Sequence, residues 1–281
     1  GPRLGEITTS GYSLIKVPTP TQRLIHVHSG AEELGRNYQA LLAINSSPPA
    51  FSQCLSSINE QSGNWEILTK KARKEYLEWS KPKQTREKVD LGTIVAWLSE
   101  NTPKNTIITN GAGNYSSWVH RYYKYRSLGT GLAPTSGSMG YGTPAGICAK
   151  YLYPNRVVIS FAGDGCYLMT GQELATAVQY NIPIIIIIIN NGTYGTIRMH
   201  QEREYPERVF ATNLKNPDFS SLARAYGAFG EKVERTQDFP KTFKRAIKCN
   251  QPAIIEVITS PETITPSTTI SKIRKNALNL I

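Results

Sequence analysis

Residues 156–194, RVVISFAGDGCYLMTGQELATAVQYNIPIIIIIINNGTY, decide the fold. Two apolar runs, 157–162 and 184–189, each end in a polar turn, Gly-Asp-Gly after the first and Asn-Asn after the second. The segment between them is too long for a hairpin and suits a helical crossover, so the two runs are predicted to be neighbouring parallel strands. Ligands of such sheets bind outside the carboxyl ends of the strands, which is where both turns lie.

The two turns carry the residue types of a magnesium and phosphate site. The carboxylate of Asp164, the side-chain carbonyl of an Asn from the pair Asn190-Asn191 and a nearby main-chain carbonyl are hard oxygen ligands, which suit Mg2+ better than a soft metal. Gly163 and Gly165 allow the backbone to close on a phosphate, and the amino end of the following helix favours negative charge. The stretch therefore predicts a site for a magnesium-bridged diphosphate.

The order Gly-Asp-Gly, crossover, Asn-Asn resembles the cofactor motif of thiamine diphosphate enzymes, and the chain resembles the acetolactate synthase large-subunit-like members of that family. The resemblance implies an α/β fold with a doubly wound, mostly parallel sheet. It implies thiamine diphosphate as cofactor and Mg2+ held by Asp164, Asn191 and the main-chain carbonyl of Thr193. It also places Gly163, Gly165, Cys166 and Tyr194 beside the cofactor.

A second glycine-containing turn, NGAGNY at 110–115, follows a short predicted strand at 106–109. Alone it could be an ordinary strand-to-helix turn. At the carboxyl end of the first strand of a doubly wound domain it becomes a candidate phosphate loop. The resemblance assigns the diphosphate contacts in this loop to Ala112, Gly113, Asn114 and Tyr115.

The segment LAPTSGSMGYG, 132–142, is too rich in Gly, Ser and Pro for a regular element. Its single Met is weak support for a site, because methionines often fill gaps in cores. In the family, a large apolar side chain here holds the cofactor in a bent form, with its amine close to the reactive carbon. The resemblance gives that role to Met139, and makes the Gly137 carbonyl the acceptor for the amine.

Composition sets the class of protein. Charged residues make up 19% and hydrophobic residues 40% of the 281 residues, which is typical of a globular chain. Residues 70–88 contribute +5 of the net charge of +11. This stretch is predicted to be a solvated helix and linker, and no nucleic-acid-binding motif accompanies it. The isoleucine run is bounded by Pro183 and Asn190, so it predicts a buried strand and no membrane span. The four cysteines are scattered, which indicates neither disulfides nor zinc and favours the cytoplasm.

The chain is predicted to contain two parts. Residues 1–82 resemble the end of a Rossmann-like central domain with a linker, and residues 83–281 resemble the diphosphate-binding domain. Flavin-binding members of the family hold FAD in the central domain, but His28 stands where they commonly have Asp, so FAD is left open. The pattern predicts regular elements at 23–28, 52–58, 65–79, 91–100, 117–126, 219–226, 227–233, 239–249 and 253–258, with Asp90 as an N-cap and a basic tail at 266–281.

The resemblance implies decarboxylation or carboligation, or both, of a 2-oxo acid. Two positions depart from acetolactate synthases: Ile7 aligns with their carboxylate-binding Arg and His200 with their substrate-gating Trp. A benzoylformate- or indolepyruvate-type decarboxylase therefore stays open. Family members activate the cofactor with a Glu from a pyrimidine-binding domain of a neighbouring subunit, and residues 1–281 contain no counterpart of that domain. The resemblance therefore implies a homodimer or homotetramer, and a chain that binds the cofactor without turnover on its own.

Overall fold

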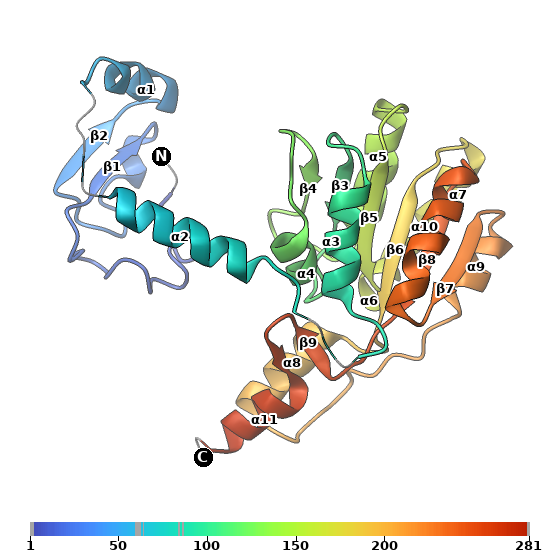
Figure 1. The fold of residues 1–281 in the computed structure, drawn as a ribbon. Coiled ribbons are helices and arrows are strands. Elements are labelled where there is room, and N and C mark those ends of the chain that lie inside the picture. The colour runs from blue at the N-terminus through green and yellow to red at the C-terminus, as the bar shows by residue number, and fades with distance from the viewer. Residues whose placement is uncertain (1–2, 60–62, 64, 84, 86, 280–281) are drawn as a thin grey trace. The chain divides into compact units, whose positions relative to one another are not determined.

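The computed structural model describes residues 3–59, 63, 65–83, 85 and 87–279, which form two compact units, Gly1–Lys70 and Lys71–Ile281 (Figure 1). Helix α2, Glu66–Trp79, contains the boundary between the units and matches the helix predicted at 65–79. The domain boundary expected after residue 82 stays a prediction. Among the described residues, no helix combines the length and the apolar character needed to cross a membrane.

The first unit holds a small parallel sheet. Strand β1, Ile25–His28, pairs in parallel with β2, Leu42–Asn45, and the 3-10 helix η1, Ala31–Glu33, lies between them in sequence. Helix α1 runs from Pro48 to Ser56, so it begins and ends earlier than the predicted 52–58. The earlier start follows from its cap, because the Ser47 side chain accepts a hydrogen bond from the Ala50 N–H and prolines fill the first positions.

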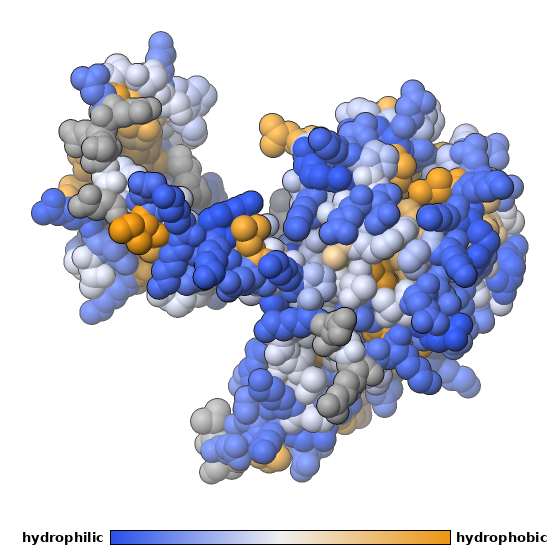
Figure 2. Space-filling model, in the orientation of Figure 1, coloured by the Kyte–Doolittle hydropathy of each residue, from blue (hydrophilic) through white to orange (hydrophobic). Residues whose placement is uncertain are grey.

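The second unit is built on a six-stranded sheet in the order β4-β3-β5-β6-β8-β7, and every pairing in it is parallel. This confirms the predicted doubly wound α/β fold and the parallel pairing of the two strands of 156–194. Hydrophilic side chains cover most of the visible face of this unit (Figure 2). The strands are β3 Ile107–Asn110, β4 Gly131–Leu132, β5 Val158–Gly163, β6 Ile185–Asn190, β7 Phe229–Val233 and β8 Ala253–Ile258.

Helices cover both faces of the sheet and form two hydrophobic cores. One face packs against α3 (Leu91–Asn101), α4 (Ser116–Tyr122) and α10 (Phe239–Lys248). The other packs against α5 (Gly142–Leu152), α7 (Leu174–Gln179) and α9 (Phe219–Ala225). Helix α3 starts as predicted, because Asp90 accepts a hydrogen bond from the Thr93 N–H at 3.0 Å. The remaining elements are α6 Asp164–Tyr167, η2 Gly171–Glu173, α8 Gly195–Glu204, η3 Thr236–Asp238, β9 Thr263–Thr265, β10 Thr268–Thr269 and α11 Ile270–Leu278.

The isoleucine run explains how one strand serves both cores. Ile185, Ile187 and Ile189 belong to the core beneath α3, α4 and α10, whereas Ile186 and Ile188 belong to the opposite core. Each of the five is at most 5% exposed. Successive side chains of a strand point to opposite faces, so a strand covered on both sides must be apolar at every position. The run therefore fixes β6 in the centre of the sheet.

Two predicted details are wrong, and one helix was not predicted. The single crossover helix between β5 and β6 is divided into α6, η2 and α7, and Gly171 at the break packs against the Tyr167 ring. The helix predicted at 117–126 ends at Tyr122, because Tyr123 is extended and its hydroxyl lies 3.3 Å from the Thr102 hydroxyl in the core. Helix α5, whose first residue Gly142 lies against the backbone of β3, had no counterpart among the predicted elements.

The C-terminal helix α11 is fixed to α8 by a buried carboxylate. Glu202 of α8 has a fully buried side chain and accepts hydrogen bonds from Arg274 of α11 at 2.6 and 2.8 Å. Arg198, one turn earlier on α8, donates to it at 2.9 Å. The hydrogen bonds from Arg274 are the largest influence that lowers the pKa of Glu202, from its ordinary value of 4.5 to about 2. The basic tail, whose placement the sequence left open, therefore packs on α8.

We expect Arg274→Met to destabilise the protein. Removing one partner of a buried ion pair typically costs about 3–5 kcal/mol, and because Arg198 remains, about 2 kcal/mol is expected. The lowered pKa makes this stabilisation complete above pH 4.5 and progressively lost as the pH falls toward about 2. Urea unfolding of wild type and variant across that range should show the difference shrinking on acidification. The exposed pair Arg235–Asp238 supplies the control, because Arg235→Met should not change the midpoint at any pH.

Candidate functional site

The two polar turns of 156–194 meet at one edge of the sheet. Gly163, the last residue of β5, pairs in register with Ile189 of β6, so Asp164 and Asn191 follow neighbouring strands at the same end. Asp164 is buried, at 3% exposure, and Asn191 is half-buried. The predicted juxtaposition of these two side chains at the carboxyl ends of parallel strands is therefore present.

A pocket of about 250 Å³ opens at this edge. Four segments build it: the loop after β3, the loop before α5, the β5–α6 turn, and the turn after β6 with the start of α8. It brings together every residue that the sequence assigned to the cofactor, and the contacts that each makes with a cofactor stay predictions. Those residues are Ala112, Gly113, Asn114, Tyr115, Gly137, Met139, Gly163, Asp164, Gly165, Cys166, Asn191, Thr193 and Tyr194.

Asp164 is held by three donors. Its Oδ1 accepts from the Gly165 N–H at 2.9 Å, and its Oδ2 accepts from the Gly192 N–H at 2.8 Å and from Asn216 Nδ2 at 2.7 Å. Burial raises the pKa of Asp164, and these hydrogen bonds act in the opposite direction. A carboxylate offers about four acceptor positions, so capacity remains for a cation on the pocket side.

Asn216 is a site residue that the sequence analysis missed. It lies in the irregular segment between α8 and α9. In addition to its hydrogen bond to Asp164, Asn216 Nδ2 donates to Asn190 Oδ1 at 2.9 Å. The same segment pairs with the turn after β6: the Tyr194 N–H donates to the Thr212 carbonyl at 2.9 Å, and the Leu214 N–H to the Gly192 carbonyl at 2.8 Å. Nothing local in the sequence marks Asn216, because its partners are separated from it by tens of residues.

The turn after β6 has a defined shape. Gly192 has φ +68°, a conformation that favours glycine, and Asn191 Oδ1 accepts from the Thr193 N–H at 3.2 Å. The Thr193 hydroxyl donates to the Thr212 carbonyl at 2.8 Å. Helix α8 begins at Gly195, and its first residues line the pocket, so a helix amino end adjoins the site. The sequence had placed that helix end after Gly-Asp-Gly, where α6 is only four residues long.

The loop after β3 is tied to the opposite wall of the pocket. Asn114 Oδ1 accepts from the Thr196 hydroxyl at 2.9 Å, which links the loop to α8. The Tyr115 hydroxyl lies 3.4 Å from Cys166 Sγ, and burial is the largest cause that raises the pKa of Tyr115. The Cys166 thiol also accepts from the Gly140 N–H at 3.2 Å. Cys166 therefore connects the β5–α6 turn to both glycine-rich loops.

The loop before α5 presents its apolar side chain to the pocket. Gly137 has φ +67° and Gly140 has φ +82°, so both sides of Met139 adopt backbone conformations that favour glycine. The Thr170 hydroxyl donates to the Gly140 carbonyl at 2.6 Å and anchors the loop. Met139 is 38% exposed and lines the pocket, which sets it apart from a methionine that fills a core.

Other candidate residues lie outside the pocket lining. His200 is exposed on α8. His26 is buried in the first unit, and His28 Nδ1 accepts from the Gly30 N–H at 2.9 Å. In the part of the chain that the structure describes, no three His, Cys, Asp or Glu side chains are grouped to hold a metal. A cation at this pocket would therefore need amide and main-chain oxygens beside Asp164, which is the donor set of Mg2+.

Comparisons with known proteins place the chain among thiamine pyrophosphate enzymes. The family described as "Thiamine pyrophosphate enzyme, C-terminal TPP binding domain" matches residues 111–257, more than half of the chain. A "Probable acetolactate synthase large subunit" of Methanocaldococcus jannaschii is 36% identical over 165 residues, 58% of this chain and 28% of the relative. The "Acetolactate synthase large subunit" of Lactococcus lactis is 34% identical over 243 residues, 84% of this chain and 41% of the relative.

A solved structure is similar over most of the chain. The thiamine diphosphate-dependent 4-hydroxybenzoylformate decarboxylase of Rhodococcus jostii superposes with a TM-score of 0.68 at 28% identity, and the match covers 86% of this chain and 45% of that one. The chain thus spans less than half the length of these relatives.

Proposed function

The chain belongs to the thiamine pyrophosphate enzyme family through its C-terminal TPP-binding domain, and on that basis we propose that it binds thiamine diphosphate with Mg2+ for the decarboxylation or carboligation of 2-oxo acids. One observation carries the proposal. Thirteen residues chosen from the sequence for cofactor contact line one pocket, where the buried Asp164 and the half-buried Asn191 follow adjacent strands.

The pocket residues fit the proposed group. Asp164, the Asn191 side-chain oxygen and the Thr193 main-chain carbonyl would hold Mg2+, since all three are hard oxygen ligands. The glycine-containing loop 112–115, the β5–α6 turn and the start of α8 would hold the diphosphate. Gly137 and Met139 would hold the ring end in its bent form.

In the proposed reaction, the cofactor and the residues of the chain have different roles. When bound, thiamine diphosphate supplies a nucleophilic carbon for attack on the carbonyl of a 2-oxo acid. The chain contributes binding and orientation, and Met139 adds an apolar surface that excludes water. No proton-transferring group has been assigned at the pocket, so we propose that the activating Glu belongs to a pyrimidine-binding domain outside residues 1–281. A homodimer or homotetramer would bring that domain to the site.

Two candidate activities remain. The sequence relatives named above are acetolactate synthases, which favours carboligation. The structural match over 86% of the chain is a 2-oxo acid decarboxylase, which favours decarboxylation without ligation. Product analysis with pyruvate and with benzoylformate, on a sample that also contains the proposed pyrimidine-binding domain, would separate them. FAD binding is a separate question, which the flavin absorbance of the purified protein answers.

The proposal is tested by cofactor titration of residues 1–281. We expect thiamine diphosphate to raise the thermal midpoint only when Mg2+ is present, because Asp164 and Asn191 would bind the diphosphate through the metal. ATP with Mg2+ and a single-stranded oligonucleotide are the controls, and stabilisation by either of them alone would point to a nucleotide- or nucleic-acid-binding domain instead. The same sample should not decarboxylate pyruvate, and robust turnover by it would contradict the proposed need for a second domain.

A further inference from the structure

Glu256 is a charged residue in the centre of a strand that is otherwise apolar. Strand β8, AIIEVI, lies between β6 and β7, and the Glu256 side chain is about 1% exposed. A strand covered on both faces is expected to be apolar throughout. A carboxylate at such a position is costly unless its oxygens accept hydrogen bonds, so its partners indicate its purpose.

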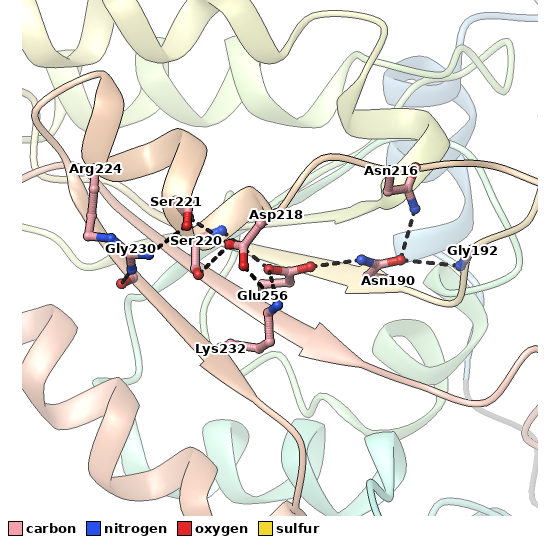
Figure 3. Close-up of polar contacts among 10 residues, drawn as sticks. All are labelled: Asn190, Gly192, Asn216, Asp218, Ser220, Ser221, Arg224, Gly230, Lys232 and Glu256. Atoms are coloured by element: carbon pink, nitrogen blue, oxygen red, sulfur yellow. Dashed lines mark hydrogen bonds and ion pairs between the residues drawn. The ribbon is translucent and has the colours of Figure 1, made fainter.

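Both carboxylate oxygens of Glu256 have partners (Figure 3). Oε1 accepts from Asn190 Nδ2 at 2.8 Å. Oε2 accepts from the Ser220 N–H at the start of α9 at 3.2 Å, and lies 3.8 Å from Lys232 Nζ. Lys232 stands opposite Glu256 in the β7–β8 register and also donates to Asp218 at 3.0 Å.

These contacts fix the orientation of the Asn190 amide. A carboxylate can only accept, so Asn190 must turn its NH2 group toward Glu256. Its Oδ1 then faces the turn after β6, where it accepts from the Gly192 N–H at 3.2 Å and from Asn216 Nδ2 at 2.9 Å. The reversed amide would place its NH2 group against these two donors.

The same two donors hold Asp164. The Gly192 N–H and Asn216 Nδ2 each donate to Asp164 Oδ2, at 2.8 and 2.7 Å. Each is therefore shared between the Asn190 amide oxygen and the Asp164 carboxylate. A hydrogen-bonded path thus runs from Glu256 through Asn190 to Asp164, without Glu256 lining the pocket.

We propose that Glu256 is a positioning residue for the magnesium end of the site: it sets the Asn190 amide, which holds the Gly192 turn and Asn216 against Asp164. The proposal rests on the proposed function for its ligand, Mg2+ with thiamine diphosphate. Its structural part concerns only the order of the turn after β6 and can be measured without any ligand.

Two single variants and their combination test the path. In Glu256→Gln the new amide faces a mismatch: its NH2 group must lie either against the Ser220 N–H and Lys232 or against the Asn190 NH2 group. In Asn190→Asp two carboxylates face each other. The double variant restores complementarity, because the amide introduced at position 256 can donate to the carboxylate introduced at position 190 while its own oxygen accepts from Ser220. The new carboxylate at position 190 still accepts from Gly192 and Asn216.

Lys232→Met is the matched control. It removes a charged neighbour of Glu256 but leaves the hydrogen bond to Asn190 in place. A role of Glu256 in general stability would affect the Lys232 variant as well, and would not be restored by exchanging the polarity of positions 190 and 256.

Two measurements are needed on the full 281-residue chain. Hydrogen exchange of the peptide containing 190–194, without ligand, should be about tenfold faster in each single variant and near wild type in the double variant and in Lys232→Met. Exchange in β3 should be unchanged in all of them. The apparent Mg2+ affinity, from thermal shifts at saturating thiamine diphosphate, should be about tenfold weaker in the single variants and recover in the double.

The outcomes separate the two proposals. Wild-type exchange rates in Glu256→Gln, or a double variant no better than the single variants, would overturn the positioning role. If the exchange rates follow the expected order but wild type shows no response to Mg2+ and thiamine diphosphate, the proposed function fails while the role of Glu256 in ordering the turn stands.

Discussion

Asp164→Ala is expected to abolish the Mg2+-dependent stabilisation by thiamine diphosphate, with an affinity loss of about 100-fold or more, since losing a charged metal ligand costs several kcal/mol. Asp164 is the one carboxylate among the three proposed ligands. Without it, Asn191 and the Thr193 carbonyl would face the cation as neutral groups. The variant also leaves the Gly165 N–H, the Gly192 N–H and Asn216 Nδ2 without this acceptor.

The isosteric variant Asp164→Asn separates charge from shape. It keeps one oxygen as an acceptor, but its NH2 group must face at least one of the donors that now bind Asp164. We expect it to bind as weakly as Asp164→Ala. Asp238→Asn changes the charge equally at a partly exposed position outside the pocket lining and should bind as wild type does. Binding is measured by thermal shift and by calorimetry with and without Mg2+, and undiminished stabilisation of Asp164→Asn would remove Asp164 from the metal site.

Among the glycines of the sheet, we expect Gly230 to be the one at which substitution by Ala destabilises the protein most. A Cβ at Gly230 in β7 would fall on the Ser220 carbonyl oxygen and lie 3.0 Å from Ala223 Cβ, both on α9. The obstacle is backbone, so α9 would have to move away from the sheet. Overpacking of this kind costs about 1–3 kcal/mol, and we expect the upper end of that range.

The control for Gly230→Ala is a glycine at which an added methyl group meets no neighbouring atom. A Cβ added at Gly5 would meet no atom within 4 Å beyond its chain neighbours, and Gly5 is not among the glycines with positive φ. Gly5→Ala should therefore leave the urea midpoint unchanged within about 0.5 kcal/mol. Because the Ser220 N–H is a partner of Glu256, a displaced α9 should also weaken the cofactor response of Gly230→Ala. An unfolding midpoint equal to that of Gly5→Ala would show that α9 adjusts without cost.

The sequence predicted the site through two properties of parallel sheets. Apolar runs marked β5 and β6, and the rule that ligands bind at the carboxyl ends of strands placed Asp164 and Asn191 together. The resemblance added Met139 and the loop 112–115, and all of these residues line one pocket. Patterns of this kind are recognised from neighbouring residues in the sequence, so they can be used for prediction without knowledge of tertiary contacts.

What the sequence could not predict depends on partners that are distant along the chain. Asn216 has no local signature, and its importance follows only from the segment that runs beside the turn after β6. Glu256 did leave a signal, namely a charge in a run of apolar residues, but its partner Asn190 was not deducible. The division of the crossover after α6 has a different, local cause, because it depends on close packing between Gly171 and the ring of Tyr167, four residues earlier.

Helix α8 connects the pocket to the C-terminal helix α11. Its first turn borders the pocket, and its last turn holds α11 through Glu202 and Arg274. A ligand that orders the first turn and a helix that secures the last turn therefore stabilise the same element, and their effects are thermodynamically linked. Cutting the chain after β10 would remove Arg274 and leave the buried Glu202 with Arg198 as its remaining guanidinium partner. Protein shortened in this way should bind its ligand more weakly although no pocket residue has been touched, and the occupied pocket should in turn protect the C-terminal helix from proteases.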